Sequence, residues 1–172
     1  MNDGPLSQPS GRGTGWVIAQ IPLLLAAIML PVLERLSHGP ESWSRATAAS
    51  ARAAGIIGAG LSLTVLWRAA RALGSGLVPF PKPPANAILR QTGIYGRVRH
   101  PIYLGILCAV ASWALLWRSR LGLALLLPNI AFFGAKSRYE ERFLLARFPE
   151  YAAYQRRVPA LIPRCRLPRA TG

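Results

Sequence analysis

The stretch Gly93-Ile94-Tyr95-Gly96-Arg97-Val98-Arg99-His100-Pro101-Ile102-Tyr103-Leu104 joins a polar turn to a long apolar run. Proline fixes its own φ and disfavours the α region for the residue before it, so we expect His100 to cap a helix that begins at Pro101. The free N–H groups of that first turn and the helix dipole favour an anion. His100 is then placed either to bind a ligand or to serve as a purely structural cap, beside arginines that contact lipid phosphates, and the spacing leaves both open.

Four apolar runs without a charged residue dominate this chain of 172 residues, 52% of which are hydrophobic. They are Trp16–Leu33, Ala53–Trp67, Ile102–Trp117 and Leu121–Ala135. The first run has 18 residues, near the minimum for crossing the hydrocarbon core, and the others have 15 or 16. Tryptophans lie at or near the run ends, as in the aromatic belt of a membrane protein. We therefore predict an all-α integral membrane protein with about four transmembrane helices. Buried core helices of a soluble protein are the alternative.

The basic residues are unevenly distributed. If the four runs alternate across a membrane, 16 of the 21 Lys and Arg lie on one side and five on the other. The positive-inside rule then places both termini and residues 68–101 in the cytoplasm, and we expect the inner membrane of a bacterium. Attraction to anionic lipids accounts for the net charge of +15, and no nucleic-acid motif accompanies it, so we expect membrane lipid and no nucleic acid as a partner.

The segments divide as follows. Residues 1–15 are expected to be a disordered tail, 16–77 to form two transmembrane helices, 78–165 to form the functional core, and 166–172 to be a basic tail. The first run is expected to be retained, because its apolar core is longer than that of a usual signal peptide. The core holds a proline-rich strap and a tight hairpin of two transmembrane helices joined by residues 118–120. The second of these helices is expected to be kinked at Pro128, to continue into the cytoplasm and to end at Pro149. The small face of Gly55, Gly58 and Gly60 permits helix pairing, so a homo-oligomer is possible.

Glu140 and Glu141 are the only adjacent carboxylates in a chain with six acidic residues. Neighbours on a helix point about 100° apart, so we expect only one of them to face a pocket. Glu140 follows Lys136 by one turn, and the two could hold each other. In one interpretation the glutamates are exposed and pair with Arg138 and Arg142. In the other, Glu140 receives the cationic or hydroxyl part of a cofactor whose anionic part lies at Pro101. No spacing of His and Cys indicates a metal site.

The stretch from Gly93 to Tyr103 resembles the signature of the isoprenylcysteine carboxyl methyltransferases and their relatives, the phospholipid N-methyltransferases. The later segments Glu140-Glu141, Phe148-Pro149-Glu150-Tyr151-Ala152-Ala153-Tyr154, Arg157-Val158-Pro159 and Ile162-Pro163 agree with it, so the resemblance covers about residues 78–165. It implies S-adenosylmethionine, bound in a cytoplasmic pocket formed by the hairpin, the preceding loop and the C-terminal helical tail. It also implies an amphiphilic or lipid-linked substrate. The implied cofactor contacts are Ala87, Ile88, Leu89, Arg90, Tyr95, His100, Pro101, Ile102, Tyr103, Glu140 and Glu141.

The resemblance also implies the catalytic residues Lys136, Arg138 and Glu140. In the family a basic residue one turn before the glutamate helps to hold the substrate carboxylate, and Lys136 has that place here. The leading prediction is carboxyl O-methylation, which needs no base at pH 7. Phosphatidylethanolamine N-methylation is the alternative, and it needs a base such as Glu140 or Tyr103. An NADPH-dependent membrane reductase of the sterol type, and a non-catalytic protein in which His100 and Glu140 are structural, are more remote.

Overall fold

The computed structural model describes residues 13–38, 43–74 and 88–163, and within these ranges the chain is helical without a strand. The elements are α1 (Thr14–His38), α2 (Arg45–Leu73), the 3-10 turn η2 (Gly93–Gly96), α3 (Pro101–Trp117), α4 (Arg120–Ala124), α5 (Leu126–Arg147) and α6 (Tyr151–Arg157). The all-α prediction is confirmed for these residues. Helix α1 begins within the tail that we expected to be disordered. The proline-rich strap and the basic tail lie outside the described residues.

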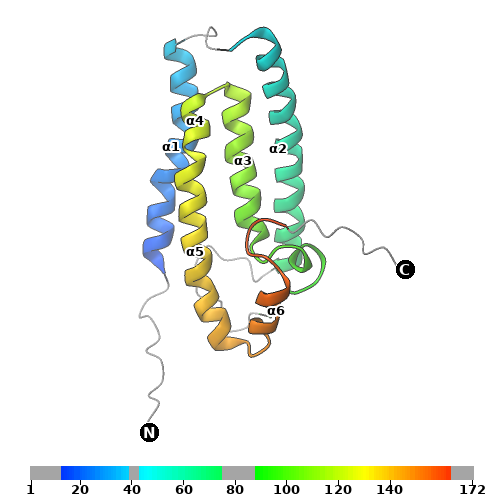
Figure 1. The fold of residues 1–172 in the computed structure, drawn as a ribbon. Coiled ribbons are helices and arrows are strands. Elements are labelled where there is room, and N and C mark those ends of the chain that lie inside the picture. The colour runs from blue at the N-terminus through cyan, green and yellow to red at the C-terminus, as the bar shows by residue number, and fades with distance from the viewer. Residues whose placement is uncertain (1–12, 39–42, 75–87, 164–172) are drawn as a thin grey trace, which may run out of the picture.

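The bundle consists of α1, α2, α3 and the pair α4–α5, whose two helices lie in line with each other (Figure 1). Helix α5 continues past the end of α3, and α6 lies beside this extension. We expected the last long helix to end at Pro149. Helix α5 ends close to that position, at Arg147, and Phe148 is its C-cap. The functional stretch at residues 93–101 therefore comes close to the extension of α5 and to α6 at the same end of the bundle (Figure 1).

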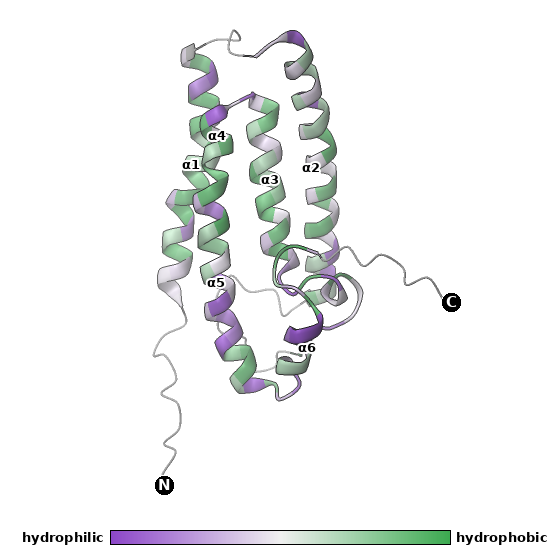
Figure 2. Ribbon diagram, in the orientation of Figure 1, coloured by the Kyte–Doolittle hydropathy of each residue, from purple (hydrophilic) through white to green (hydrophobic). Residues whose placement is uncertain are grey.

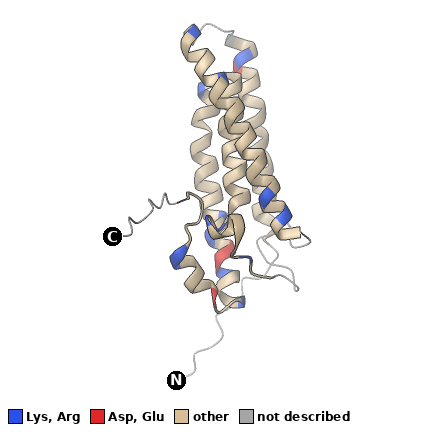
Figure 3. Cartoon of the chain, turned by 90° about the vertical axis from the view of Figure 1, so that its right-hand side faces the viewer, with Lys and Arg blue, Asp and Glu red and all other residues tan. Residues whose placement is uncertain are grey.

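Helices α1 and α2 are long and apolar enough to cross a membrane. Their apolar side chains point outward, since only 11% and 17% of their most apolar segments are buried. Ile18 and Leu63 are examples, with exposed fractions of 62% and 68%. A buried core helix of a soluble protein would show the opposite pattern, so this alternative is contradicted. The charged residues lie toward the two ends and leave the middle of the bundle free of charge (Figure 3), and the hydropathy follows the same division (Figure 2).

Gly55 and Gly58 of α2 lie close to α3 of the same chain. A Cβ on Gly58 would lie 2.4 Å from Ser112 Oγ, and one on Gly55 would lie 2.9 Å from Leu116 Cγ. On the facing helix, a Cβ on Gly105 would lie 2.7 Å from Leu66. Helix α3 therefore packs against Gly55 and Gly58 of the small face on which we based the possible homo-oligomer, whereas a Cβ on Gly60 would meet no atom within 4 Å. Pairing between copies of the chain stays a prediction.

Only Arg118 and Ser119 join α3 to α4, as a tight hairpin requires. Arg118 adopts φ 55° in the left-handed region, and Ser119 Oγ accepts a hydrogen bond from the N–H of Gly122. Glu34 of α1 accepts hydrogen bonds from the Ser119 hydroxyl and from the N–H of Leu121, so α1 is fixed to this turn. Where we expected a kink at Pro128, the helix is interrupted at Leu125, which keeps αR backbone angles between α4 and α5. Proline lacks the N–H that would bond the carbonyl four residues earlier, at the end of α4.

Candidate functional site

The site begins where α3 begins. His100 is the N-cap of α3 and Pro101 is its first residue, which confirms the predicted boundary. Two backbone hydrogen bonds hold this turn against the segment after α6: the N–H of Arg99 donates to Pro159 O at 2.9 Å, and that of His100 donates to Ala160 O at 3.0 Å. The His100 side chain makes no capping bond, so its ring is available for other contacts.

The His100 ring lies between the two adjacent glutamates. Its Nε2 lies 2.9 Å from Glu141 Oε1, and its Nδ1 lies 3.6 Å from Glu140 Oε2. Tyr103, one turn later on α3, stacks on the ring with centroids 5.4 Å apart and donates a hydrogen bond to Glu140 Oε2 at 2.8 Å. Both glutamates contact this ring, and the expectation that only one of them faces a pocket stays a prediction. A single imidazole projects between the two carboxylates, and its nitrogens on opposite sides of the ring bridge the 100° separation.

Glu141 is the buried, fully used carboxylate. It accepts hydrogen bonds from Arg99 Nε and His100 Nε2 through one oxygen and from Gln155 Nε2 through the other, each at 2.9 Å. Arg99 Nη2 is also 2.8 Å from Glu141 Oε1, and both side chains are 8% exposed. Arg99 in addition donates to the carbonyl oxygens of Gln155 and Val158. Arg99 thus ties α5 to the end of α6.

The interpretation in which exposed glutamates pair with neighbouring arginines of their own helix is wrong. Arg138 and Arg142 are exposed, and the partner of Glu141 is Arg99 from the turn before α3. The same ion pair leaves the Arg99 side chain only 8% exposed, so little of it is available to lipid phosphates.

The environments of the two glutamates shift their pKa values in opposite directions. Burial raises the pKa of Glu140, and the neighbouring Glu141 adds to this against the opposing effects of His100, Tyr103 and Lys136. Burial alone would also raise the pKa of Glu141, but the hydrogen bonds and charges of His100 and Arg99 hold it below its ordinary value. Adjacent carboxyl groups with opposite shifts are suited to different roles, one fixed as an anion and one able to take up a proton.

Lys136 is a buried cation without a carboxylate partner in the described part of the chain. It is 2% exposed, and its Nζ donates to Gln20 Oε1 of α1 at 2.5 Å and lies 5.4 Å from the centre of the Tyr103 ring. Burial lowers the pKa of Lys136, and the charge of Glu140 opposes this shift. The predicted interaction between Lys136 and Glu140 is therefore not a direct ion pair, since the Lys136 ammonium donates its hydrogen bond to the neutral Gln20.

The other predicted cofactor residues are brought together in part. Tyr95 is buried, and its carbonyl accepts a hydrogen bond from the Tyr154 hydroxyl at 2.6 Å. Leu89 packs against Tyr151, Tyr154 and Val158. Pro101 is buried, Ile102 is half-buried, Ile88 and Arg90 are exposed, and Ala87 lies outside the described residues.

Sequence reasoning missed Gln20 and Gln155. Gln20 could have been singled out from the sequence, because its polar amide lies within the first apolar run, where polar groups are costly. Gln155 carried none, because a glutamine in a polar helix is unremarkable.

The sequence profile of the phospholipid methyltransferases matches residues 49–150, which include His100, both glutamates and Lys136. The chain belongs to the phospholipid methyltransferase family. The match extends from α2 to the residue before α6, so Gln20 and Gln155 lie beyond it. The predicted resemblance is confirmed.

Two curated relatives match part of the chain, and one of them is named as a methyltransferase. The chain is 42% identical over 72 residues to methanethiol S-methyltransferase 2 of Bradyrhizobium diazoefficiens, which is 41% of this chain and 27% of that protein. It is 38% identical over 83 residues to the cobalt-zinc-cadmium resistance protein CzcN of Cupriavidus metallidurans, which is 48% of this chain and 38% of that protein. The matches thus cover well under half of each relative.

Proposed function

We propose that this chain transfers the methyl group of S-adenosylmethionine to a carboxylate carried by an amphiphilic or lipid-linked molecule. Membership of a methyltransferase family supports the reaction class. The observation that carries the choice of acceptor is Lys136, a buried ammonium whose hydrogen-bond partner is a neutral amide. A buried charge is costly unless it is paired, so this position favours an anionic ligand.

The residues around Glu140 fit the cofactor. S-adenosylmethionine carries a sulfonium and an ammonium cation, and both suit a carboxylate beside aromatic rings. Glu140 offers Oε1, which has no hydrogen-bond partner among the described residues, while Tyr103 holds Oε2. The Glu140 side chain is 25% exposed, so a ligand can reach it. When bound, the cofactor supplies an activated methyl group; the residues here hold and orient it.

Lys136 would then hold the acceptor within reach of the same site. Its ammonium lies over the Tyr103 ring and Glu140 bonds the Tyr103 hydroxyl, so an anion on Lys136 and a cation on Glu140 would both lie next to this tyrosine. A carboxylate is already ionised at pH 7 and needs no base, so positioning supplies most of the rate. An amine acceptor is less well supported, because its positive charge would be repelled by Lys136.

A second candidate is S-methylation of a small thiol. One relative is named for this reaction, and Glu140 has a raised pKa that suits a proton acceptor. A thiol must lose its proton before it attacks, and the resulting thiolate would pair with Lys136 as a carboxylate would.

The test is transfer of labelled methyl from S-adenosylmethionine by the protein in lipid nanodiscs, with a prenylcysteine analogue, methanethiol or native lipid extract as acceptor. Base-labile label released as methanol supports the carboxylate. Base-stable label in a volatile sulfide selects the thiol and contradicts our leading choice. Label in phospholipid, or in no fraction, contradicts both.

Two variants separate cofactor from acceptor binding. Glu140→Gln should weaken cofactor binding measured by calorimetry, whereas Lys136→Gln should leave it within about threefold and raise the KM for the acceptor. Arg142→Gln, an exposed change on the same helix, is the matched control for charge. Equal effects of Lys136→Gln and Arg142→Gln would contradict the assigned role of Lys136.

A further inference from the structure

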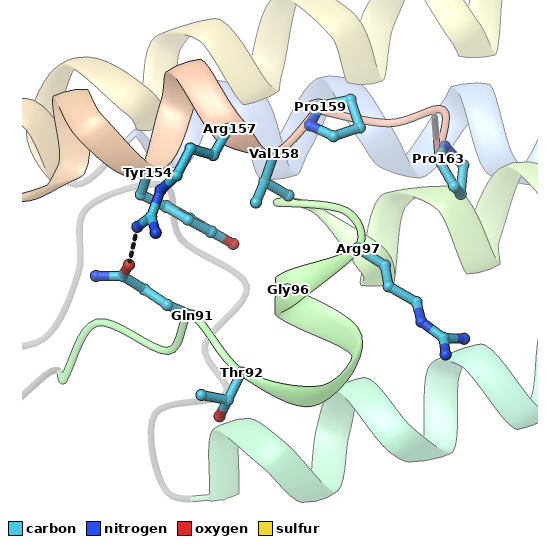
Figure 4. Close-up of a pocket in the computed structure, with 9 residues that line it drawn as sticks. All are labelled: Gln91, Thr92, Gly96, Arg97, Tyr154, Arg157, Val158, Pro159 and Pro163. Carbon is cyan, nitrogen blue, oxygen red and sulfur yellow. Dashed lines mark hydrogen bonds between the residues drawn. The ribbon is translucent and has the colours of Figure 1, made fainter. Parts of the chain in front are cut away.

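A cavity of about 660 Å³ opens between η2, the turn before it and the end of α6 (Figure 4). Its walls include Gln91, Arg97, Tyr154, Arg157 and Pro163. This volume is in the range of small-molecule sites. None of these residues is among the predicted cofactor contacts, and the proposed function leaves the cavity unused.

The cavity is positively charged. The charged residues among those lining it are Arg97 and Arg157, and no carboxylate is among the described residues of its wall. Arg157 donates from Nη2 to Gln91 Oε1 at 3.2 Å and from Nε to Ala153 O at 3.4 Å, which leaves its Nη1 group for a ligand. Arg97 lies on the other side of the opening, and its guanidinium group points away from Arg157 (Figure 4). Guanidinium groups are suited to binding phosphate, and each of these two lies at a different side of the cavity.

The rim of the cavity indicates that this phosphate belongs to a lipid. Ile162 precedes the lining residue Pro163 and is 78% exposed, and Ile88, three residues before Gln91, is 70% exposed. Isoleucines this exposed, beside arginines at the end of an apolar bundle, are typical of a surface that inserts into the membrane interface. Basic pockets at that level bind anionic headgroups.

The cavity is separate from the methyl-transfer site but adjoins it. Val158 and Pro159 form part of its wall. On the other side of the same backbone, Val158 O and Pro159 O accept hydrogen bonds from Arg99, which in turn holds Glu141. A ligand in the cavity would therefore stabilise the segment that packs against His100.

We propose that this cavity binds the phosphate of an anionic phospholipid, in a headgroup site distinct from the methyl acceptor. The inference does not depend on the identity of the acceptor. Binding at this site would depend on Arg97 and Arg157 themselves, and it would exceed the general attraction of a basic protein for an anionic membrane.

The test is thermal unfolding of the full chain in a neutral detergent with added phosphatidylglycerol, phosphatidylcholine or soluble glycerol 3-phosphate. Phosphatidylglycerol should raise the Tm saturably, and more than phosphatidylcholine does, because only the former carries a net negative charge. Glycerol 3-phosphate should give no comparable shift. An equal, saturable shift with glycerol 3-phosphate would overturn the assignment to a lipid.

The double variant Arg97→Gln, Arg157→Gln tests the site itself. The matched control is Arg142→Gln, Arg156→Gln, which removes the same charge from two exposed residues outside the cavity lining. The affinity for phosphatidylglycerol should fall at least tenfold further in the cavity variant than in the control. Equal losses would overturn the site in favour of general attraction. Arg97→Lys, Arg157→Lys keeps the charge and should lose less, which guards against a folding defect in the glutamine variant.

Discussion

Glu141→Gln should loosen the C-terminal segment from the bundle. Glutamine keeps the shape and one acceptor oxygen, but it removes the charge and turns an NH₂ group toward donors of Arg99, His100 or Gln155. Removing one partner of a buried, hydrogen-bonded ion pair costs about 3–5 kcal/mol. The full range applies because both Arg99 and Glu141 are 8% exposed, which leaves little solvent to screen the unpaired guanidinium. Since 1.4 kcal/mol is tenfold, local opening should rise by about 10² to several thousandfold.

Hydrogen exchange followed by mass spectrometry, in nanodiscs, measures this opening. The amides of Arg99 and His100, which bond Pro159 and Ala160, should exchange faster together with those of α6, while those of α2 keep their protection. Glu150→Gln is the control, because Glu150 is exposed and precedes α6. If Glu141→Gln changed exchange no more than Glu150→Gln, the ion pair would not be what holds the segment.

Three further outcomes are expected. Tyr154→Phe should destabilise the protein by about 1–3 kcal/mol in chemical denaturation, because the buried carbonyl of Tyr95 loses its hydrogen-bond donor. Tyr151→Phe should be near neutral, because the buried Tyr151 hydroxyl has no partner among the described residues. A larger loss of stability for Tyr151→Phe than for Tyr154→Phe would refute both expectations. Gln20→Leu should raise the acceptor KM more than it lowers kcat, because it removes the hydrogen bond from Lys136 to Gln20; kinetics with unchanged KM would argue against this positioning role. Cofactor affinity should rise with pH as Glu140, whose pKa is raised, becomes ionised and attracts the cation, and Glu140→Gln should flatten this profile in calorimetry at several pH values.

The sequence was sufficient to predict the start of α3 and the residues around it. Proline restricts its own φ and the conformation of the residue before it, so His100 and Pro101 could be placed without knowledge of tertiary structure. The helical class and the outward apolar faces followed from long uncharged runs for similar reasons. The break at Leu125 was predicted as a kink three residues later, because proline acts on the turn that precedes it.

The contacts within the site could not be predicted in this way. Helix geometry correctly separates Glu140 and Glu141 by about 100°, but it does not show that an imidazole from another helix lies between them. The partner of Glu141 is 42 residues away in sequence, and that of Lys136 is 116 residues away. Which of several arginines pairs with a glutamate depends on how the helices pack, and local spacing carries no information about it.

The two glutamates show how the ends of the helices make a polar site at the limit of an apolar bundle. Helix α5 continues beyond α3, so part of the contacts to its carboxylates comes from outside α3. The turn before α3 supplies Arg99 and α6 supplies Gln155, and both are used on Glu141. Glu140 has the neutral Tyr103 as its hydrogen-bond donor, and its other oxygen has no hydrogen-bond partner among the described residues. The partners that hold Glu141 in place therefore leave Glu140 positioned, desolvated and available for a cationic ligand.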